Sequence, residues 1–355
     1  MNAPAHMAAG SVSAVPLGDA PAWDAYVARH SGASPFHSRL WCEAITHATG
    51  HRCHLVTTRD AGGALTGLLP LHHIRSRIFG EALVASGFAV GGGILADSPA
   101  VGAALAEGAA DIARSLGVSS VELRGGPLPE DAGWHREEGV YAGFARELAR
   151  DDEAELLAIP RKQRAEVRKA LAGNLRVTTG RDDAERRDHY RVYAESVRNL
   201  GSPVFPRGLF DAVLDAFGDD AEILTVRERD RPVASVLSLY WRGAVMPYWG
   251  GGTFEARRLR ANELMYYALM GRARERGCTR FDFGRSKFGT GPFSYKKNWG
   301  FEPEPLVYAR WLAPGERPRD TNPNSARYRM QVEAWKKLPL WAANRLGPLI
   351  ARGLG

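Results

Sequence analysis

The densest group of chemically useful side chains in this sequence lies between Arg280 and Tyr308. An apolar strand pattern ends at Gly284. A glycine-rich turn and then an aromatic and basic run follow it. Cations placed among aromatic rings suit a ligand that carries anionic or π-rich groups. The candidate site residues of this stretch are Asp282, Arg285, Ser286, Lys287, Tyr295, Lys296, Lys297 and Trp299. The structural alternative is a basic surface loop that aromatic side chains hold against the core.

A second candidate is the segment that begins at Trp249, where a glycine triplet precedes an arginine-rich loop and a helix pattern. Glycine lets a backbone come close to a ligand, and arginines before a helix N-terminus favour phosphate. The candidate substrate-binding residues are Trp249, Gly250, Gly251, Arg258, Arg260 and Asn262, with Arg198 from the end of an earlier helix pattern. The alternative is a tight structural turn.

The elements around these residues occur twice along the chain. Residues 54–76 and 222–243 each show two apolar strand patterns separated by a polar turn. A glycine triplet follows in each half, at Gly91 and at Gly250. The first triplet follows an apolar stretch at 87–90, which we predict to be a strand.

Each triplet leads into a helix pattern that ends at a glycine, Gly117 or Gly277, as helix C-termini prefer. A further strand pattern then begins, at Ser119 and at Thr279. We therefore predict a tandem duplication of one α/β (α+β) domain, each copy a mixed β-sheet flanked by helices. The alternative is two unrelated α/β pieces with similar turn chemistry.

The length of 355 residues also favours two domains. A highly charged segment with a helical pattern, residues 151–173, joins the halves or opens the second. We predict an N-terminal domain over 1–150, a C-terminal domain carrying the active site over 151–315, and a tail over 316–355.

Composition narrows the function classes. The net charge of +7 favours anionic partners such as phosphates, nucleotides or tRNA, but the excess is too modest for a DNA-binding protein. The three cysteines, Cys42, Cys53 and Cys278, are too few for a disulfide framework. Cys53 lies between His51 and His54, but no second cluster completes a metal site, so we predict no metal.

We expect a cytoplasmic protein, because the N-terminus lacks the features of a signal peptide and no apolar run reaches about 18 residues. The segment 336–352 alternates Leu and Trp with Lys and Arg. Such a segment suits peripheral contact with the inner face of a membrane. The alternative is a terminal helix packed on its domain, which we favour because Gly347-Pro348 interrupts the helix pattern.

The stretch FDFGRSKFGTGPFSYKKNWGFEPEPLVY, preceded by YWGGG and RRLRANELMYYALM, resembles the FemAB-related proteins of the exosortase (PEP-CTERM) associated type. The resemblance covers Phe36 to about Leu312, and the segment NPNSARYRMQVEAWKKLPL also fits. It implies a tandem GNAT fold and an N-acyltransferase. Fem enzymes transfer an amino acid from aminoacyl-tRNA to an amine of a peptidoglycan precursor, whereas related GNAT proteins use acyl-CoA.

The resemblance also implies a role for Tyr295-Lys296, since the matching lysine in Fem enzymes stabilises the tetrahedral intermediate. The loop that begins at Arg257 lacks the small glycines of the Q/R-x-x-G-x-G/A loop with which GNAT proteins bind CoA. The helical coiled-coil arm of some Fem enzymes has no counterpart. We expect no tightly bound cofactor, and the donor stays open between aminoacyl-tRNA and acyl-CoA. The acceptor is an amine of a peptide or saccharide precursor of the envelope or an exopolysaccharide, including a lipid-linked one.

For mechanism, we expect Lys296 to donate to the oxyanion that forms when an amine attacks an acyl carbonyl. Arg285 and Lys297 would hold phosphates or carboxylates. Asp282 would accept a proton or orient Arg285. Replacing Lys296 with methionine should lower kcat by roughly 10²-fold and barely change the melting temperature. Two alternatives remain: an acyl-CoA-dependent N-acetyltransferase acting on a small amine, and a non-catalytic scaffold or RNA-binding module with the same fold.

Overall fold

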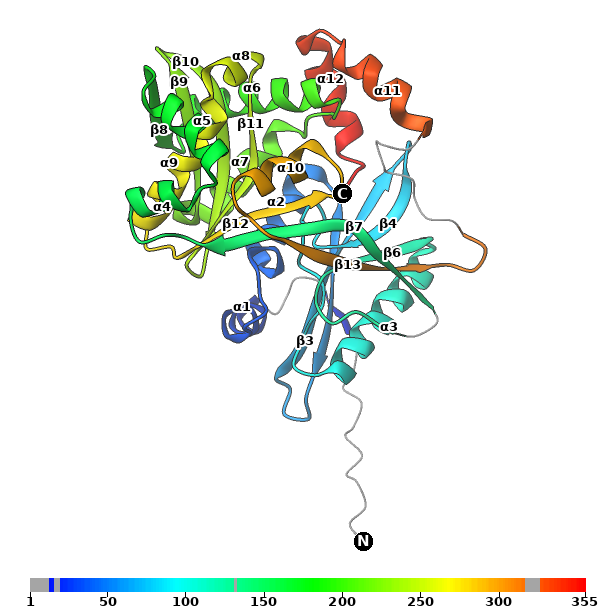
Figure 1. The fold of residues 1–355 in the computed structure, drawn as a ribbon. Helices are drawn as coiled ribbons and strands as arrows, with labels where there is room; N and C mark the ends of the chain where they lie inside the picture. Colours follow the sequence, from blue (N-terminus) through cyan, green and yellow to red (C-terminus); the bar gives the residue numbers. More distant parts are fainter. Residues whose placement is uncertain (1–12, 16–19, 131–132, 317–325) are drawn as a thin grey trace. The chain divides into compact units, whose positions relative to one another are not determined.

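The described residues fall into two compact units, in a computed structural model that describes residues 13–15, 20–130, 133–316 and 326–355 (Figure 1). Unit 1 runs to Glu137 and takes in the chain again from Val307. Unit 2 holds Glu138–Leu306 and the terminal segment up to Leu354. These units differ from the predicted ranges because the chain passes between them within two long strands, and because the terminal segment groups with unit 2.

Unit 1 is a mixed sheet in the order β1-β2-β3-β4-β6-β13, with β5 paired to β3. Helix α3 packs on β2, β3 and β6, and its alanine-rich face fills the core with the apolar side chains of those strands. The elements are β1 (Ser13–Val15), α1 (Ala20–Arg29), the 3-10 helix η1 (Pro35–His37), α2 (Arg39–Thr49), β2 (Arg52–Arg59), β3 (Leu65–Ser76), β4 (Gly80–Ala85), β5 (Leu95–Ala96), α3 (Pro99–Leu116), β6 (Ser120–Arg124) and, entering from unit 2, β13 (Pro303–Leu312).

The strands of unit 2 follow one another in the sheet in the order β7-β12-β11-β10-β9-β8. The first of these strands, β7, begins in unit 1. The elements are β7 (Trp134–Glu147), α4 (Asp152–Ala158), α5 (Arg161–Leu171), β8 (Leu175–Gly180), α6 (Asp183–Leu200), α7 (Arg207–Phe217), the 3-10 helix η2 (Gly218–Asp220), β9 (Ala221–Glu228), β10 (Arg231–Trp241), β11 (Ala244–Gly252), α8 (Phe254–Leu259), α9 (Ala261–Glu275), β12 (Arg280–Lys287), α10 (Gly291–Asn298), α11 (Ala326–Lys336) and α12 (Leu340–Ala351).

The predicted duplication is confirmed by strand order and direction. In each unit two antiparallel pairings lead to a parallel pair, β4 with β6 and β11 with β12, and the chain crosses between the parallel strands through α3 or α9. Gly117 and Gly277 follow those helices with φ of 66° and 76°, a conformation that suits glycine. The predicted strand at 87–90 is wrong: a turn with positive φ at Ser86 and Phe88 follows β4.

Helices cover both faces of the unit 2 sheet. Neighbouring residues of β10 point to opposite sides of the sheet, so they contact different helices. Ser235 faces α6, where its hydroxyl lies 3.0 Å from His189 Nδ1. Ala234 and Val236 face α9 and belong to the core cluster that also contains Met265 of that helix. The site-bearing strands β11 and β12 are thereby held between two packed layers.

Helix α12 runs through Pro348 to Ala351, so the predicted interruption at Gly347-Pro348 is wrong. One face of small residues, Ala343, Gly347 and Ala351, is buried. A Cβ at Gly347 would lie 2.9 Å from the backbone nitrogen of Val204, which shows how closely the helix packs on its unit. Among the described residues, no helix has both the length and the apolar character needed to cross a bilayer.

Candidate active site

Lys296 lies in the short helix α10, which follows β12. Pro292 stands in the first turn of this helix, and Gly300 ends it with a φ of 82°. The side chain is only 9 % exposed, whereas its neighbour Lys297 is exposed. The two lysines of the predicted basic run therefore lie in different environments, and only Lys296 points inward.

The Lys296 ammonium is enclosed by one carbonyl and two aromatic rings. Its Nζ donates to the backbone carbonyl of Arg285 at 2.9 Å. The same atom lies 5.4 Å from the ring centroid of Phe144 on β7 and 5.3 Å from that of Phe283 on β12. Ring faces attract a cation, but they replace few of the hydrogen bonds that water would give it.

Burial lowers the pKa of Lys296 from its ordinary 10.5 to about 7. The Asp282 carboxylate acts in the opposite direction and raises this pKa, while the Arg285 guanidinium lowers it further. A lysine with such a pKa exchanges a proton readily near neutral pH. The site thus holds a group that can act as a hydrogen-bond donor, or give up and take back a proton.

Asp282 precedes a β-bulge in β12. The pairing of β12 with β7 shifts register between Asp282 and Arg285, and Gly284 within the bulge has a φ of 69°. One carboxylate oxygen of Asp282 accepts the Gly284 N–H at 2.9 Å, which fixes the bulge. Burial raises the pKa of the Asp282 carboxyl. The Arg285 guanidinium lies over the Tyr141 ring, 4.6 Å from its centroid.

The strands β11 and β12 separate next to this bulge. Their parallel pairing is confined to Ala244 with Arg280 and Val245 with Phe281, although both strands continue beyond these residues. The separated ends are the carboxyl ends of two neighbouring parallel strands, a usual place for ligands in α/β sheets. Ser286 lies on this part of β12, buried, with no hydrogen-bond partner for its hydroxyl among the described residues.

Two further polar atoms on α10 are buried without a hydrogen bond in the described part of the chain, the Tyr295 hydroxyl and the Trp299 indole N–H. Both rings pack beside Tyr266 of α9, at centroid distances of 6.0 and 6.2 Å. Burial raises the pKa of Tyr295 well above its ordinary 10.0 and also raises that of Glu263. Tyr295 interacts with Trp299 and Glu263, but none of these contacts has the geometry of a full hydrogen bond, so these polar atoms are candidates for contact with a bound molecule or with water.

The glycine triplet proves to serve packing. Gly250, Gly251 and Gly252 form the end of β11 rather than a loop. A Cβ on Gly250 would lie 2.9 Å from Val236 Cγ2, and one on Gly251 would lie 2.2 Å from Ser196 Oγ. The small size of these residues is thus required by neighbours within unit 2, and the expected role in ligand approach is not needed to explain them.

Two of the three arginines after the triplet pair with carboxylates. Arg258 contacts Glu255 at 3.1 Å, and Arg260, at a positive φ before α9, contacts Glu166 of α5. This segment forms the short helix α8 rather than a loop. Paired arginines leave less positive charge for a phosphate than the sequence indicated.

Of three other predicted residues, Trp249 and Arg198 have structural surroundings. Trp249 is 4 % exposed and packs edge-on against Phe210, with ring centroids 4.9 Å apart. Arg198 belongs to α6 and donates to the carbonyl of Lys336 at 3.3 Å. Asn262 is on α9, with a buried side-chain oxygen that has no partner among the described residues.

Lys287 also lies beside Tyr141, with its Nζ 5.6 Å from the centroid of the Tyr141 ring. The structure thus brings together Asp282, Arg285, Tyr295, Lys296 and the residues Phe144 and Tyr141. These two residues lie before residue 150, in the range predicted for the N-terminal domain. Nothing in the sequence pairs Tyr141 and Phe144 with β12.

Comparison with known proteins agrees with this architecture. Residues 160–297 match the family described as acetyltransferase (GNAT) domain. The solved structure titled "Crystal structure of FemX" superposes with a TM-score of 0.64 at 16 % identity, covering 85 % of this chain and 97 % of that one.

Two other structures give weaker superpositions. A tandem GNAT protein from the clavulanic acid biosynthesis pathway has a TM-score of 0.54 at 13 % identity and covers 86 % of this chain and 99 % of that one. L-PGS from Bacillus licheniformis has 0.52 at 12 %, with 89 % and 96 % covered. Among curated proteins, none matches the sequence. The chain therefore has a tandem GNAT fold, and its second half contains the matched acetyltransferase domain.

Proposed function

We propose that the protein is an N-acyltransferase whose unit 2 transfers an aminoacyl or acyl group to the amine of a precursor of the cell envelope or of an exopolysaccharide. One observation carries the proposal. Lys296 is a desolvated lysine with a pKa of about 7, held beside a β-bulge where two parallel strands separate. Buried lysines with strongly shifted pKa values are concentrated at functional sites.

The chemistry needs few groups. The acceptor amine attacks the acyl carbonyl, the amine loses a proton, and the departing hydroxyl or thiol gains one. Negative charge develops on the carbonyl oxygen in between, and the Lys296 ammonium is a donor already fixed by its carbonyl and aromatic contacts. An anionic donor molecule bound nearby would raise the pKa of Lys296 and favour its charged form. Asp282 favours the same form.

For the acyl donor we favour aminoacyl-tRNA over acyl-CoA. Two of the arginines that precede α9, Arg258 and Arg260, pair with Glu255 and Glu166, and the space beside Gly250 and Gly251 is occupied by neighbouring side chains. Both features make this segment less suited to binding the pyrophosphate of acyl-CoA. The exposed Lys297 and the partly exposed Arg285 provide positive charge near Lys296 instead. The alternative donor, acetyl-CoA with a small amine acceptor, is the competing outcome of the test.

Thermal unfolding will separate the two donors. We expect aminoacyl-tRNA, carrying a non-hydrolysable amide link, to raise Tm, because a ligand at about 100 times its Kd adds roughly 2.7 kcal/mol to the free energy of unfolding. Acetyl-CoA should leave Tm unchanged. Uncharged tRNA is the control for binding through the nucleic acid alone. A rise with acetyl-CoA only would replace our donor assignment, and mass spectrometry of the acceptor pool for one added acyl mass would then identify the product.

We further propose that the protein acts at the cytoplasmic face of the membrane, with α12 in contact with anionic lipid. The helix has no acidic residue, and its outer face carries Trp341 and Leu349, which are 73 % and 75 % exposed, with Arg345 between them. Exposed tryptophan and leucine beside arginine match a lipid interface. A lipid-linked acceptor would explain why a transferase keeps such a surface.

Vesicle sedimentation tests this surface. We expect the protein to pellet with vesicles that contain phosphatidylglycerol and not with pure phosphatidylcholine, and we expect the double variant Trp341→Ala, Leu349→Ala to stay in solution. The matched control is Ile78→Ala, which removes another exposed apolar side chain, 62 % exposed, from a turn in unit 1. Equal pelleting of both variants would refute the assignment to α12.

A further inference from the structure

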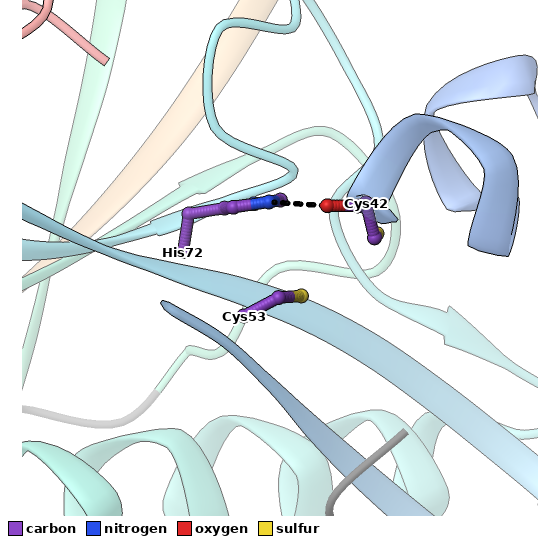
Figure 2. Close-up of side chains that lie close together, drawn as sticks. All are labelled: Cys42, Cys53 and His72. Carbon is purple, nitrogen blue, oxygen red and sulfur yellow. Dashed lines mark hydrogen bonds between the residues drawn. The ribbon is translucent and has the colours of Figure 1, made fainter. Parts of the chain in front are cut away.

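Three side chains in unit 1 that the proposed reaction does not use lie close together. Cys42 on α2, Cys53 on β2 and His72 on β3 place two sulfurs and a ring nitrogen within 4.8 Å of one another (Figure 2). Cys53 and His72 are direct cross-strand partners, so their side chains share one face of the sheet. Cys42 and His72 are fully buried, whereas Cys53 is partly exposed. Both thiols are reduced.

This group differs from the one that the sequence suggests, in which Cys53 is grouped with His51 and His54. His54 follows Cys53 on the same strand and therefore points to the opposite face, where its ring lies 6.4 Å from that of His73. His51 precedes β2, and its Nδ1 accepts the backbone N–H of Arg75. Neither histidine belongs to the group around Cys53.

The hydrogen bonds of His72 decide what chemistry the group favours. Its Nδ1 accepts the backbone N–H of Gly87 at 3.0 Å, so the ring proton is on Nε2, which faces the carbonyl of Cys42 at 3.4 Å (Figure 2). A metal-binding histidine needs a free lone pair on one nitrogen and normally donates the other N–H to an acceptor. His72 has the reverse arrangement, and it presents an N–H to its surroundings. The geometry therefore favours a thiolate over a metal ion as the partner of this ring.

The two thiols are not equivalent. The Cys42 thiol donates a hydrogen bond that lowers the pKa of Cys53. Burial of Cys53 acts in the opposite direction, and the neighbouring His72 lowers the pKa further. Burial raises the pKa of Cys42. A thiol of lowered pKa beside a second thiol is the arrangement in which the first sulfur reacts and the second resolves the product.

We propose that Cys53 and Cys42 form an oxidation site for small hydroperoxides, with His72 as a positioning residue that donates to the reacting sulfur. The Cys53 thiolate attacks the peroxide O–O bond, takes one oxygen and becomes a sulfenic acid, and the released alkoxide or hydroxide takes up a proton. The Cys42 sulfur then attacks that of Cys53. Water leaves with the thiol proton, and a disulfide joins α2 to β2. Two thiols are oxidised and one hydroperoxide is reduced.

The sequence offers a direct readout of this disulfide. Trypsin cleaves after Arg39, Arg52 and Arg59, so Cys42 and Cys53 fall in separate peptides, 40–52 and 53–59. After treatment of the intact protein with hydrogen peroxide, we expect these two peptides to appear joined under non-reducing conditions, with the loss of two hydrogen masses. Dithiothreitol should separate them. The third cysteine, Cys278 in unit 2, should remain a free thiol.

Variants assign the order of events. In Cys42→Ser the sulfenic acid should persist on Cys53 and be trapped by dimedone, whereas Cys53→Ser should show no trapped product on Cys42. Cys278→Ser is the control and should form the disulfide at the wild-type rate. His72→Gln should slow oxidation, because His72 is one of the groups that lower the pKa of Cys53, and circular dichroism will show whether this variant folds.

Two results would overturn the proposal. One is the absence of the joined peptides in oxidised wild-type protein, which requires no variant to fold. The other is one equivalent of zinc retained by the wild type and lost from Cys53→Ser, because that would make the group a metal site. Transfer activity enters neither readout, so the result is independent of the proposed function.

Discussion

Replacing Lys296 with methionine should lower kcat by about 10²-fold or more, the usual loss when one preorganised oxyanion donor is removed. Methionine keeps the length and apolar contacts of the side chain but cannot donate to a developing charge. The matched control is Lys162→Met, an exposed lysine on α5, which should transfer at the wild-type rate. A transfer assay with the donor that the thermal-unfolding test selects measures both rates. Equal rates for Lys296→Met and the wild type would remove Lys296 from the mechanism.

The pH profile separates a charged donor from a neutral base. If the ammonium is the active form, kcat/KM should decline as pH rises through about 7, the pKa of Lys296 in the free protein. Deprotonation of the acceptor amine raises the rate with pH, so the two effects give a maximum. A profile that only rises through this range would assign Lys296 as a base.

We expect the same variant to gain stability, and this prediction replaces the sequence-based one of a nearly unchanged melting temperature. The pKa of Lys296 is about 7 in the folded protein and near its ordinary 10.5 when unfolded. Between these values the unfolded chain binds more protons, so the free energy of unfolding rises with pH. Below about pH 7 the full cost of burying the charge is present, on the order of a few kcal/mol. Lys296→Met should remove this cost, and with it the rise in stability between pH 7 and 10.

The second large effect is expected at Glu155. This carboxylate is completely buried, and it accepts the backbone N–H of Ala149 at 2.8 Å. It also pairs with Arg146 of β7 and, at 3.4 Å, with Arg274 of α9. Glu155→Ala would leave two partly buried guanidinium groups without their shared anion. Removing one partner of a buried ion pair typically costs about 3–5 kcal/mol.

Denaturant unfolding will measure this cost. The control is Glu153→Ala on the same helix, an exposed residue whose replacement should change the free energy of unfolding by less than about 0.5 kcal/mol. Similar curves for the two variants would show that the arginines find other partners. Loss of Glu155 should also disturb the candidate active site, because β7 carries both Arg146 and the Phe144 ring that faces Lys296.

Local patterns predicted the repeated elements well. Helix ends at Gly117 and Gly277 and the hairpin around residues 60–63 follow from turn and capping chemistry. The family resemblance and the aromatic neighbours of Lys296 predict that it is catalytic, but the sequence does not show that its side chain is buried. A run of two lysines on a helix does not reveal which one faces inward until the helix phase is known.

Elsewhere, contacts between residues far apart in the sequence limited what could be predicted. The group of Cys42, Cys53 and His72 depends on the register of a hairpin and on a helix packed against it, and a one-residue change in register would move Cys53 to the other face. The carboxylates opposite Arg258 and Arg260 were equally hidden, because Glu166 is far from Arg260 in sequence. Charges read along a chain overstate the free charge of a folded surface for this reason.

The entry of β7 into unit 2 before residue 150 has a consequence for dissecting the molecule. A fragment cut at the predicted boundary, 151–315, would lose the strand that pairs with β12 from Arg280 to Lys287 and would leave that side of β12 open to aggregation. It would also lack Phe144. A self-contained catalytic piece must start no later than Glu138, and supplying residues 138–150 as a separate peptide should restore solubility to the shorter fragment.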